Sequence, residues 1–294
     1  VNDAPTGAIT APSAGLVGNA PYSTTITANA ADSDGTIASV AFYSGATLLG
    51  TDFAAPYTFA WNAVPAGTYV LKAVAKDNLG ATTTSSTVTV TVNAPPTVSL
   101  TAPSAGSLGT APASTTITAN AADADGTVAQ VAFYAGATLL GTDSTAPYSF
   151  AWNNIAAGID VLKAVATDND GATTNSSTVT VTVNAAPTVT ITAPAAGLLG
   201  TAPYSTTISA TAADSDGTIA QVQFYDGATL IGTDLTSPYA VAWNNVAAGS
   251  HNLTAVAKDN SGATTTSSTV TVTINAAPTV SITAPTAGTY GPAP

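Results

Sequence analysis

The sequence predicts an all-β chain built from three tandem seven-stranded β-sandwiches in a linear array. Two observations support this prediction: the chain repeats itself at a fixed spacing, and apolar and polar residues alternate within each repeat. Trp61, Trp152 and Trp243 lie 91 residues apart, and no insertion or deletion breaks this register. A solenoid repeat is about 20 to 50 residues long, so the longer period indicates one small domain per repeat.

The fixed spacing also predicts the domain boundaries. We expect repeats over residues 1–93, 94–184 and 185–275, followed by a linker and the first strand of a further repeat over residues 276–294. The chain begins in the linker-like segment VNDAP, and we therefore expect it to be a piece of a longer protein.

Alternation within a repeat predicts the strands. In STTITANAA, Thr25 and Thr27 fall on one side of the expected strand, and Ile26 and Ala28 fall on the other. Breaks at DG, SGAT, AAP, PAG and DNLG separate about seven such segments per repeat. Seven short strands in about ninety residues, without helical periodicity, indicate an immunoglobulin-like sandwich. The predicted core residues are Phe42, Trp61, Phe133, Trp152, Phe224 and Trp243.

The composition limits the possible partners. The chain has 16 acidic residues, all Asp, and four basic residues, all Lys, which gives a formal net charge of -12. Binding to a phosphate backbone needs clustered Lys and Arg, so we exclude nucleic acid as a partner. We also expect no membrane span, because no run of residues approaches the roughly 20 apolar residues that a span requires. The absence of cysteine excludes disulfides and thiol chemistry.

Pairs of aspartates recur in every repeat, as DSDGT at Asp32, DADGT at Asp123 and DSDGT at Asp214. If the strands alternate in direction, the loops that contain these pairs share one end of the domain with two further acidic loops and with the incoming linker. The candidate metal ligands are Asp32, Asp34, Asp52, Asp77, Asp123, Asp125, Asp143, Asp168, Asp214, Asp216, Asp234 and Asp259, with Asn2, Asp3, Asn93 and Asn184 as linker ligands.

These acids have two possible roles. Calcium takes six to eight oxygen ligands, and extracellular modules bind it with dissociation constants of about 10⁻⁴ to 10⁻³ M, so a calcium ion could stiffen each junction. Alternatively, Asp-Gly and Asp-Asn-x-Gly are simply favoured turn sequences. An EF-hand is excluded, because Tyr43 stands at the twelfth position, where a bidentate Glu is required.

A catalytic role for the paired acids is disfavoured. A glycosidase needs two carboxylates that face each other across a cleft, whereas these pairs lie in expected turns and recur in every repeat. The single histidine, His251, replaces Tyr69 and Asp160 of the other repeats, and we expect it to be a tolerated surface substitution. We therefore predict that the chain is not an enzyme and binds no organic cofactor.

The segments DSDGTIASVAFYSGATLLGTD and APYTFAWNAVPAGTYVLKAVAKDNLGATTTSSTVTVTV resemble the bacterial Ig-like domains that occur in tandem in large surface adhesins and as spacers in secreted polysaccharide-degrading enzymes. The resemblance spans all three repeats. The cysteine pair of antibody-type domains is missing. The resemblance implies a non-catalytic protein that is extracellular or on the cell surface.

Three functions follow from this organisation. The first is an extended stalk or adhesin spacer, in which each domain is about 40 Å long and three domains reach about 120 Å. The second is a subunit of a self-assembling extracellular filament, in which identical chains join by strand addition. The third is a set of spacer domains in a secreted polysaccharide-degrading enzyme. The expected partners are accordingly the neighbouring repeats and, in a fibre, identical chains.

Overall fold

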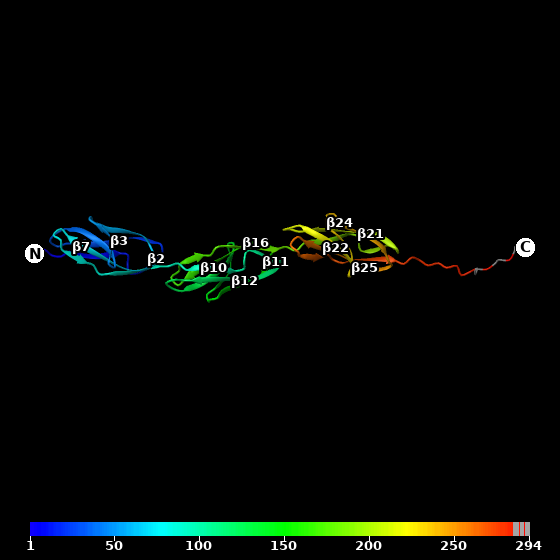
Figure 1. Ribbon diagram of the computed structural model, residues 1–294, viewed down its shortest axis with the longest axis horizontal. Helices are drawn as coiled ribbons and strands as arrows, with labels where there is room; N and C mark the ends of the chain where they lie inside the picture. Colours follow the sequence, from blue (N-terminus) through cyan, green and yellow to red (C-terminus); the bar gives the residue numbers. More distant parts are fainter. Residues whose placement is uncertain (285–287, 289–290, 292–294) are drawn as a thin grey trace. The chain divides into compact units, whose positions relative to one another are not determined.

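The computed structural model describes residues 1–284, 288 and 291, and every regular element in this part of the chain is a β-strand (Figure 1). Each repeat contains a three-stranded and a six-stranded sheet. The all-β class and the tandem immunoglobulin-like sandwiches predicted from the alternating pattern are therefore confirmed. No helix in the described residues is long and apolar enough to cross a membrane.

The strands follow the same order in each repeat. The first repeat contains β1 (Thr6–Ala11), β2 (Gly15–Asn19), β3 (Tyr22–Ala31), β4 (Ile37–Ser44), β5 (Thr47–Asp52), β6 (Tyr57–Val64), β7 (Gly67–Asp77), β8 (Thr82–Thr84) and β9 (Val88–Asn93). The second contains β10 (Thr97–Ala102), β11 (Gly106–Thr110), β12 (Ala113–Ala122), β13 (Val128–Ala135), β14 (Thr138–Asp143), β15 (Tyr148–Ile155), β16 (Gly158–Asp168), β17 (Thr173–Asn175) and β18 (Val179–Asn184). The third contains β19 (Thr188–Ala193), β20 (Gly197–Thr201), β21 (Tyr204–Ala213), β22 (Ile219–Asp226), β23 (Thr229–Asp234), β24 (Tyr239–Val246), β25 (Gly249–Asp259), β26 (Thr264–Thr266) and β27 (Val270–Asn275).

Each repeat therefore has nine strands where the alternating pattern predicted about seven. The expected first strand is two strands, because the chain bends at Pro12 and changes sheets: β1 pairs with β3 in one sheet, and β2 pairs in parallel with β9 in the other. The second additional strand is β8, which has only three residues, too few for a pattern of alternation to be recognised.

The chain divides into two compact units. One contains residues 1–106, 115–152 and 160–181, and the other contains residues 107–114, 153–159 and 182–294. The boundary between the units passes through the second repeat. The first repeat is therefore the complete sandwich in one unit, and the third repeat is the complete sandwich in the other.

The first repeat illustrates the sheet topology. The small sheet has the order β1-β3-β6, and the large sheet has the order β2-β9-β7-β4-β5, with β8 beside β7. Only the β2–β9 pair is parallel among the pairs of this repeat. The third repeat has the same order, as β19-β21-β24 and β20-β27-β25-β22-β23, with β26 beside β25. The strands that end at Asp52 and Asp77 therefore have counterparts, which end at Asp234 and Asp259, at the same places in the sheets of the third repeat.

The core lies between the two sheets. In the first repeat Phe42 of β4 and Leu71 of β7 are fully buried and pack with Ile26 of β3, so both sheets contribute to one cluster. Gly50 of β5 allows the ring of Phe59 to pack closely against this strand, because a Cβ atom at position 50 would lie 2.5 Å from that ring. The predicted core residues Phe133 and Phe224 are also fully buried, in the second and third repeats.

The three tryptophans are not equivalent. The ring of Tyr69 stands edge-on to Trp61 at 5.1 Å between centroids, and His251 stands edge-on to Trp243 at 5.2 Å. Both tryptophans are 7% exposed. Asp160 occupies the same position in the second repeat and supplies no ring, and Trp152 is only partly buried. Core packing around Trp152 is therefore less complete than the repeat spacing predicted.

The segment after the third repeat differs from its prediction. Residues 276–284 contain no strand, although their sequence matches that of β10 and β19, and the end of the expected segment, Pro285, lies outside the described residues. A strand needs a neighbour for its backbone hydrogen bonds. Val280 and Ile282 are 96% and 87% exposed, which is consistent with a segment that has no neighbour to pack against.

We predict that Asp160→Tyr stabilises the second repeat. The new ring would cover Trp152 as Tyr69 covers Trp61, and an edge-to-face aromatic pair contributes about 0.5 to 1.5 kcal/mol beyond the area that it buries. Thermal unfolding and quenching of tryptophan fluorescence by acrylamide measure the effect. Asp160→Asn is the control, because it removes the charge without adding a ring. Equal melting temperatures for the Tyr and Asn variants would contradict the prediction.

Candidate functional site

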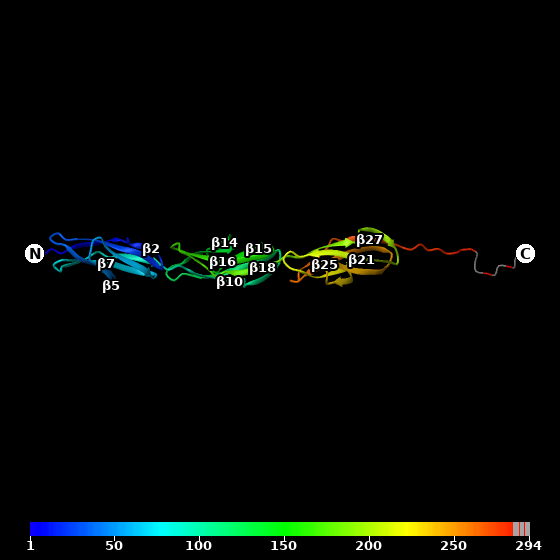
Figure 2. The same ribbon diagram turned by 90° about the horizontal axis from the view of Figure 1, so that it is seen from above.

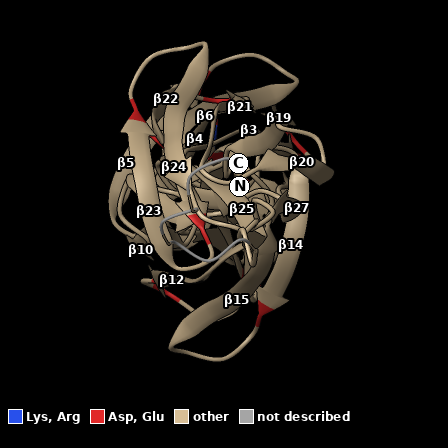
Figure 3. Cartoon of the chain, turned by 90° about the vertical axis from the view of Figure 1, so that its right-hand side faces the viewer, with Lys and Arg blue, Asp and Glu red and all other residues tan. Residues whose placement is uncertain are grey.

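Most of the aspartates occupy loops and strand ends (Figure 3). In the first repeat Asp32 and Asp34 lie in the loop between β3 and β4, Asp52 ends β5, and Asp77 ends β7. The candidate functional site is the part of this set that contacts the incoming linker. It recurs in all three repeats, so its first copy can be described in detail and the others compared with it.

Asp77 is buried and its carboxylate is fully hydrogen-bonded. Its side chain is only 1% exposed. One oxygen, Oδ1, accepts hydrogen bonds from the backbone N–H groups of Leu79 and Ala81, at 2.9 and 2.8 Å, and so closes the turn after β7. The other oxygen, Oδ2, accepts a hydrogen bond of 2.8 Å from Nδ2 of Asn2 in the linker. The Asn2 hydrogen bond is the main reason that the pKa of Asp77 lies below its ordinary value of 3.8.

The same hydrogen bond joins each linker to the repeat that follows it. Asn93 donates to Oδ2 of Asp168 at 2.8 Å, and Asn184 donates to Oδ2 of Asp259 at 2.7 Å. We call these three contacts the Asn–Asp bridges. Asn93 is 1% exposed, and its Nδ2 also donates to Oδ1 of Asn19 in the preceding repeat, at 3.2 Å. A single buried amide thus connects consecutive repeats.

A second contact holds the backbone of the linker. Oδ2 of Asp34 accepts a hydrogen bond from the N–H of Asp3 at 3.0 Å. In the later repeats the N–H of Ala94 donates to Oδ2 of Asp125 at 3.0 Å, and the N–H of Ala185 donates to Oδ2 of Asp216 at 2.9 Å. The second aspartate of each DxDG segment is therefore a linker contact.

Asp52 does not join this set. Its carboxylate accepts hydrogen bonds from the backbone of Ala54 at 3.2 Å and of Thr58 at 2.8 Å, and these bonds explain why its pKa lies below 3.8. Asp52 thus spans the corner between β5 and the start of β6. Asp143 and Asp234 form the same contacts in the other repeats. The oxygens of these three aspartates are thus used in their own turns, and none of them contacts the linker through the hydrogen bonds described above.

The first aspartate of each DxDG segment is in an unusual state. Both carboxylate oxygens of Asp32 and of Asp123, and Oδ2 of Asp214, are inaccessible to solvent and have no hydrogen-bond partner. Burial, and then the nearby charge of Asp34, raises the pKa of Asp32 above 3.8, although the backbone of Asp34 partly offsets this. An unpaired buried acceptor is costly, and either protonation or a bound cation would relieve that cost.

Asn78 is a neighbour of this carboxyl group that the candidate ligand set did not contain. Its Oδ1 accepts a hydrogen bond of 3.0 Å from the N–H of Thr36 and ties the DxDG loop to the turn after β7. A Cβ atom at Gly35 would lie 2.5 Å from Oδ1 of Asn78 and 2.6 Å from Oδ2 of Asp32, so only glycine fits between the two oxygens. The Asp-Asn-x-Gly sequence after β7 was the signal from which this role of Asn78 could have been predicted.

The predicted convergence of three or four carboxylates is not found. Among residues 1–284, 288 and 291, no three Asp or His side chains form a group that could hold a metal ion. The structure brings together two acids, Asp32 and Asp34, with the amide oxygen of Asn78 beside them. Asp77 closes the turn after β7, as the interpretation of these acids as turn residues predicted. It also accepts a hydrogen bond from the linker amide of Asn2.

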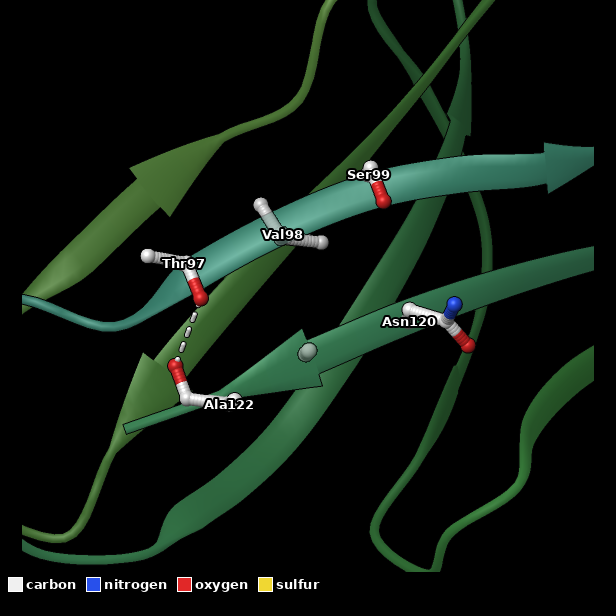
Figure 4. A pocket seen from close by; sticks show the side chains of 6 residues that line it. Thr97, Val98, Ser99, Asn120 and Ala122 are labelled. Atoms are coloured by element: carbon white, nitrogen blue, oxygen red, sulfur yellow. Dashed lines mark hydrogen bonds between the residues drawn. The ribbon is translucent and has the colours of Figure 1, made fainter. Parts of the chain in front are cut away.

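Shallow hollows lie between the first two strands of the small sheets. The hollow in the second repeat has a volume of about 220 Å³ and is lined by Thr97, Val98, Ser99, Asn120, Ala121 and Ala122 (Figure 4). Equivalent hollows in the first and third repeats have similar linings of small side chains. None of these linings contains an acid, a base or an aromatic ring, so they offer no chemistry comparable to that of the junctions.

His251 is an ordered contact residue and not a free surface substitution, contrary to the expectation from sequence. Its Nδ1 lies 2.6 Å from Oδ2 of Asp226, and its Nε2 lies 3.1 Å from the backbone oxygen of Ala247. Tyr69 makes the equivalent contact with the backbone oxygen of Pro65 through its hydroxyl group, at 2.9 Å. Burial lowers the pKa of His251, but Asp226 and the Ala247 oxygen outweigh this effect and raise the pKa above 6.5.

Fold and junction together define a class of protein: tandem immunoglobulin-like sandwiches joined by short linkers that hydrogen-bond to the next repeat. A family model described as bacterial Ig domain matches residues 5–73, 96–183 and 187–255. The chain therefore belongs to the bacterial Ig domain family, and the predicted resemblance is confirmed. A second model, bacterial Ig-like domain (group 3), matches residues 54–137. Repeats of this kind are typically non-catalytic. No curated protein matches the sequence.

The chain is similar to several solved structures. The chain is similar to the fibronectin(III)-like modules of Clostridium thermocellum CbhA, with 33% identity over 61% of this chain and 95% of that one, and a TM-score of 0.33. Three N-terminal domains of the Hoc protein of bacteriophage RB49 match at 11% identity over 94% of this chain and 99% of that one, with a TM-score of 0.39. The N-terminal eight Ig domains of Down Syndrome Cell Adhesion Molecule match at 12% identity over 92% and 36%, with a TM-score of 0.50.

We predict that the third repeat becomes less stable as the pH rises above neutrality. A histidine whose pKa is raised on folding stabilises the folded state fully below its unfolded value of 6.5, and this contribution is lost as the pH rises through the folded value. Melting temperatures between about pH 5 and about pH 8 measure the effect. In His251→Tyr the dependence should disappear, because Tyr keeps the ring and the hydrogen bond without the charge. An unchanged pH dependence in this variant would refute the assignment.

Proposed function

We propose that this chain is a non-catalytic spacer in an extracellular bacterial surface protein, which holds another part of that protein at a distance as a stalk does. The observation that carries this proposal is the recurrence of the Asn–Asp bridge at every linker. A stalk needs junctions that resist bending, and it needs them to be alike.

The physical basis of a stiff junction is the burial of its polar groups. The Asn93 amide and the Asp168 carboxylate are 1% and 2% exposed. If the linker bent away, the carboxylate would lose a hydrogen bond, and a hydrogen bond to a charged group contributes about 1.5 to 3 kcal/mol. The backbone contact of Ala94 with Asp125 adds a second attachment to the same linker. Two attachments on neighbouring residues restrict rotation more than one does.

The recurrence of the site also favours a structural role over a catalytic one. The same polar groups occur at the same positions of three consecutive repeats, and in the first repeat Asp52 and Asp77 are saturated by backbone N–H groups or by the linker amide. Carboxylates in this state are poor general bases because their lone pairs are occupied. An extracellular location agrees with the family.

We further propose that a calcium ion binds beside each DxDG loop. The unpartnered oxygens of Asp32, the carboxylate of Asp34 and the amide oxygen of Asn78 supply oxygen ligands of the kind that calcium prefers. A bound cation would neutralise the charge that burial disfavours in Asp32, and it would draw together the loop and the linker that Asp34 holds. Asp123 and Asp214 supply the same unpartnered oxygens in the second and third repeats.

Replacing both internal bridges tests the stalk. In Asn93→Ala/Asn184→Ala we expect each repeat to remain folded while the junctions bend more freely, with a loss of about 1 to 3 kcal/mol per bridge. Small-angle X-ray scattering measures the mass and the longest dimension, which for three repeats in a stalk is about 120 Å.

The control for this test is Asn153→Ala/Asn175→Ala, which removes two exposed amides from the second repeat. The proposal requires a broader distribution of dimensions in the bridge variant than in the control, with equal circular dichroism. Identical scattering curves for both variants and the native chain would show that the bridges do not hold the junctions.

The calcium proposal is tested with Asp123→Asn. Calorimetric titration should give three sites per chain for the native protein and two for this variant, whereas Asp160→Asn, with the same change of charge in the same repeat, should keep three. At a calcium concentration ten times the dissociation constant, each site stabilises its repeat by about 1.4 kcal/mol.

Melting in chelator is the second measurement. Without calcium, Asp123→Asn should melt no lower than the native protein, since the substitution removes a carboxyl group whose pKa burial raises above 3.8. No uptake at millimolar calcium would eliminate the ion.

A further inference from the structure

The basic residues of this chain lie on the outer faces of the large sheets, whereas most of its acids lie in loops and at strand ends. In the first repeat β7 lies between β2 and β5 in the large sheet (Figure 2). Each lysine of the chain is flanked along its strand by two buried residues, so its side chain points away from the core. The four lysines are Lys72 and Lys76 of β7, Lys163 of β16 and Lys258 of β25.

Two of these lysines are held beside a tyrosine. Nζ of Lys72 lies 5.5 Å from the ring centroid of Tyr43 on β4, and Nζ of Lys163 lies 5.1 Å from that of Tyr134 on β13. We call these contacts the Lys–Tyr pairs. A cation over an aromatic ring is attracted by the electrons of the ring, which orders the lysine side chain. In the described part of the chain neither lysine forms an ion pair with a carboxylate, so each ammonium group can accept an anion.

Apolar and hydroxyl-bearing side chains surround the first Lys–Tyr pair. Leu48 of β5 lies opposite Tyr43 and is 52% exposed. Val70, which points to the same side of β7 as Lys72, is 40% exposed. Exposed hydroxyl groups follow on the neighbouring strands, on Thr51, Thr84 and Thr89. The surface therefore combines one positive charge with apolar contact area and several hydroxyl groups.

We propose that each Lys–Tyr pair binds a carboxylate group of an acidic polysaccharide, a sugar chain that contains uronic acids. The ammonium group binds the carboxylate, the leucine and the tyrosine contact the C–H surface of the sugar, and the threonines hydrogen-bond to its hydroxyl groups. This inference goes beyond the proposed function and does not depend on it, because the face lies within one repeat and needs no particular junction.

Charge complementarity on this face is local. The chain carries a net charge of -12, but none of its aspartates faces outward on β4, β5 or β7: Asp52 lies opposite the buried Val40, and Asp77 is itself buried. Along β7 the strand rises about 16 Å from Lys72 to Asp77. Charges in physiological salt are screened over about 8 Å. A carboxylate at Lys72 is therefore attracted by the lysine more strongly than it is repelled by the loops.

A linear sugar chain fits this charge distribution better than a folded acidic protein or an anionic membrane does. The first and second repeats each offer a single Lys–Tyr pair. A broad surface with dense negative charge would also approach the acidic loops at the end of the domain, where it is repelled. A sugar chain can follow the outer face alone, and its hydroxyl groups match the exposed threonines.

The third repeat lacks the Lys–Tyr pair. Thr254 stands opposite Tyr225, at the position that a lysine occupies in the other two repeats. The hydroxyl group of Tyr225 donates a hydrogen bond of 3.3 Å to Oε1 of Gln223 on its own strand. We therefore expect two binding sites in this chain, one in the first repeat and one in the second.

Affinity gel electrophoresis tests the ligand class. One gel contains polygalacturonate, a second contains the fully methyl-esterified polymer, which has the same sugar backbone without charge, and a third contains poly-L-glutamate, an acidic peptide chain. We expect polygalacturonate alone to retard the native chain. Equal retardation by the ester would show that carboxylates are not recognised, and equal or stronger retardation by poly-L-glutamate would assign the face to an acidic peptide. Either result, or no retardation in any gel, would overturn the proposal.

Two double variants separate the Lys–Tyr pairs from the effect of net charge. Lys72→Gln/Lys163→Gln removes both pairs and should weaken binding to polygalacturonate about 5-fold. Lys76→Gln/Lys258→Gln removes the same number of charges from lysines that form no such pair, and it should bind as the native chain does. Circular dichroism verifies that both variants are folded. Equal weakening in the two variants would show that the pairs are not the binding sites.

The converse variant builds a site in the third repeat. Thr254→Lys places an ammonium group opposite Tyr225 and should increase retardation by polygalacturonate above that of the native chain. The control is Thr273→Lys, which adds the same charge on β27, where the partner residue is Ser250 and no tyrosine lies opposite. Equal retardation of the two lysine variants would contradict the role of the tyrosine and reduce the effect to charge alone.

Discussion

The packing of two sheets around one small core is the constraint on which the rest of each repeat depends. Alternating apolar residues on strands such as β3 and β9 point inward, and the two sheets meet where Ile26 of the small sheet packs with Phe42 and Leu71 of the large sheet. Because the strands are fixed in this way, their ends are fixed too, and the loops that carry Asp32 and Asp77 lie beside the incoming linker. The junction chemistry is thus a consequence of core packing and needs no disulfide to position it.

The four aspartates compared in the first repeat have four different environments. Asp77 is satisfied by backbone and linker donors, Asp52 spans a corner, Asp34 holds the linker backbone, and the oxygens of Asp32 are buried and unpaired. Their pKa values diverge accordingly, below 3.8 for Asp77 and Asp52 and above it for Asp32. The number of N–H donors that reach a carboxylate decides whether its pKa is lowered or raised, and loop geometry determines that number.

Much of the fold could be predicted from the sequence because its periods are simple. The spacing of Trp61 and its counterparts and the alternation in β3 indicated tandem sandwiches. The change of sheet at Pro12 escaped because the short strand that follows it, β2, has the sequence GLVGN, in which polar and apolar residues do not alternate. The site was harder to predict. Loop order placed Asp77 near Asn2, but no pattern distinguishes an oxygen bound by Ala81 from one left unpaired at Asp32. His251 was misjudged because its partner, Asp226, lies on another strand.

The position of Asn93 has a consequence for how such a chain can change in length. This residue ends the last strand of one repeat, and its partner Asp168 belongs entirely to the next, so every repeat carries one half of the coupling at each end. The halves are the same at all three linkers. A duplication or deletion of one complete 91-residue unit therefore rebuilds an intact joint automatically. Recombination between repeats can thus change the number of repeats without any new contact having to evolve.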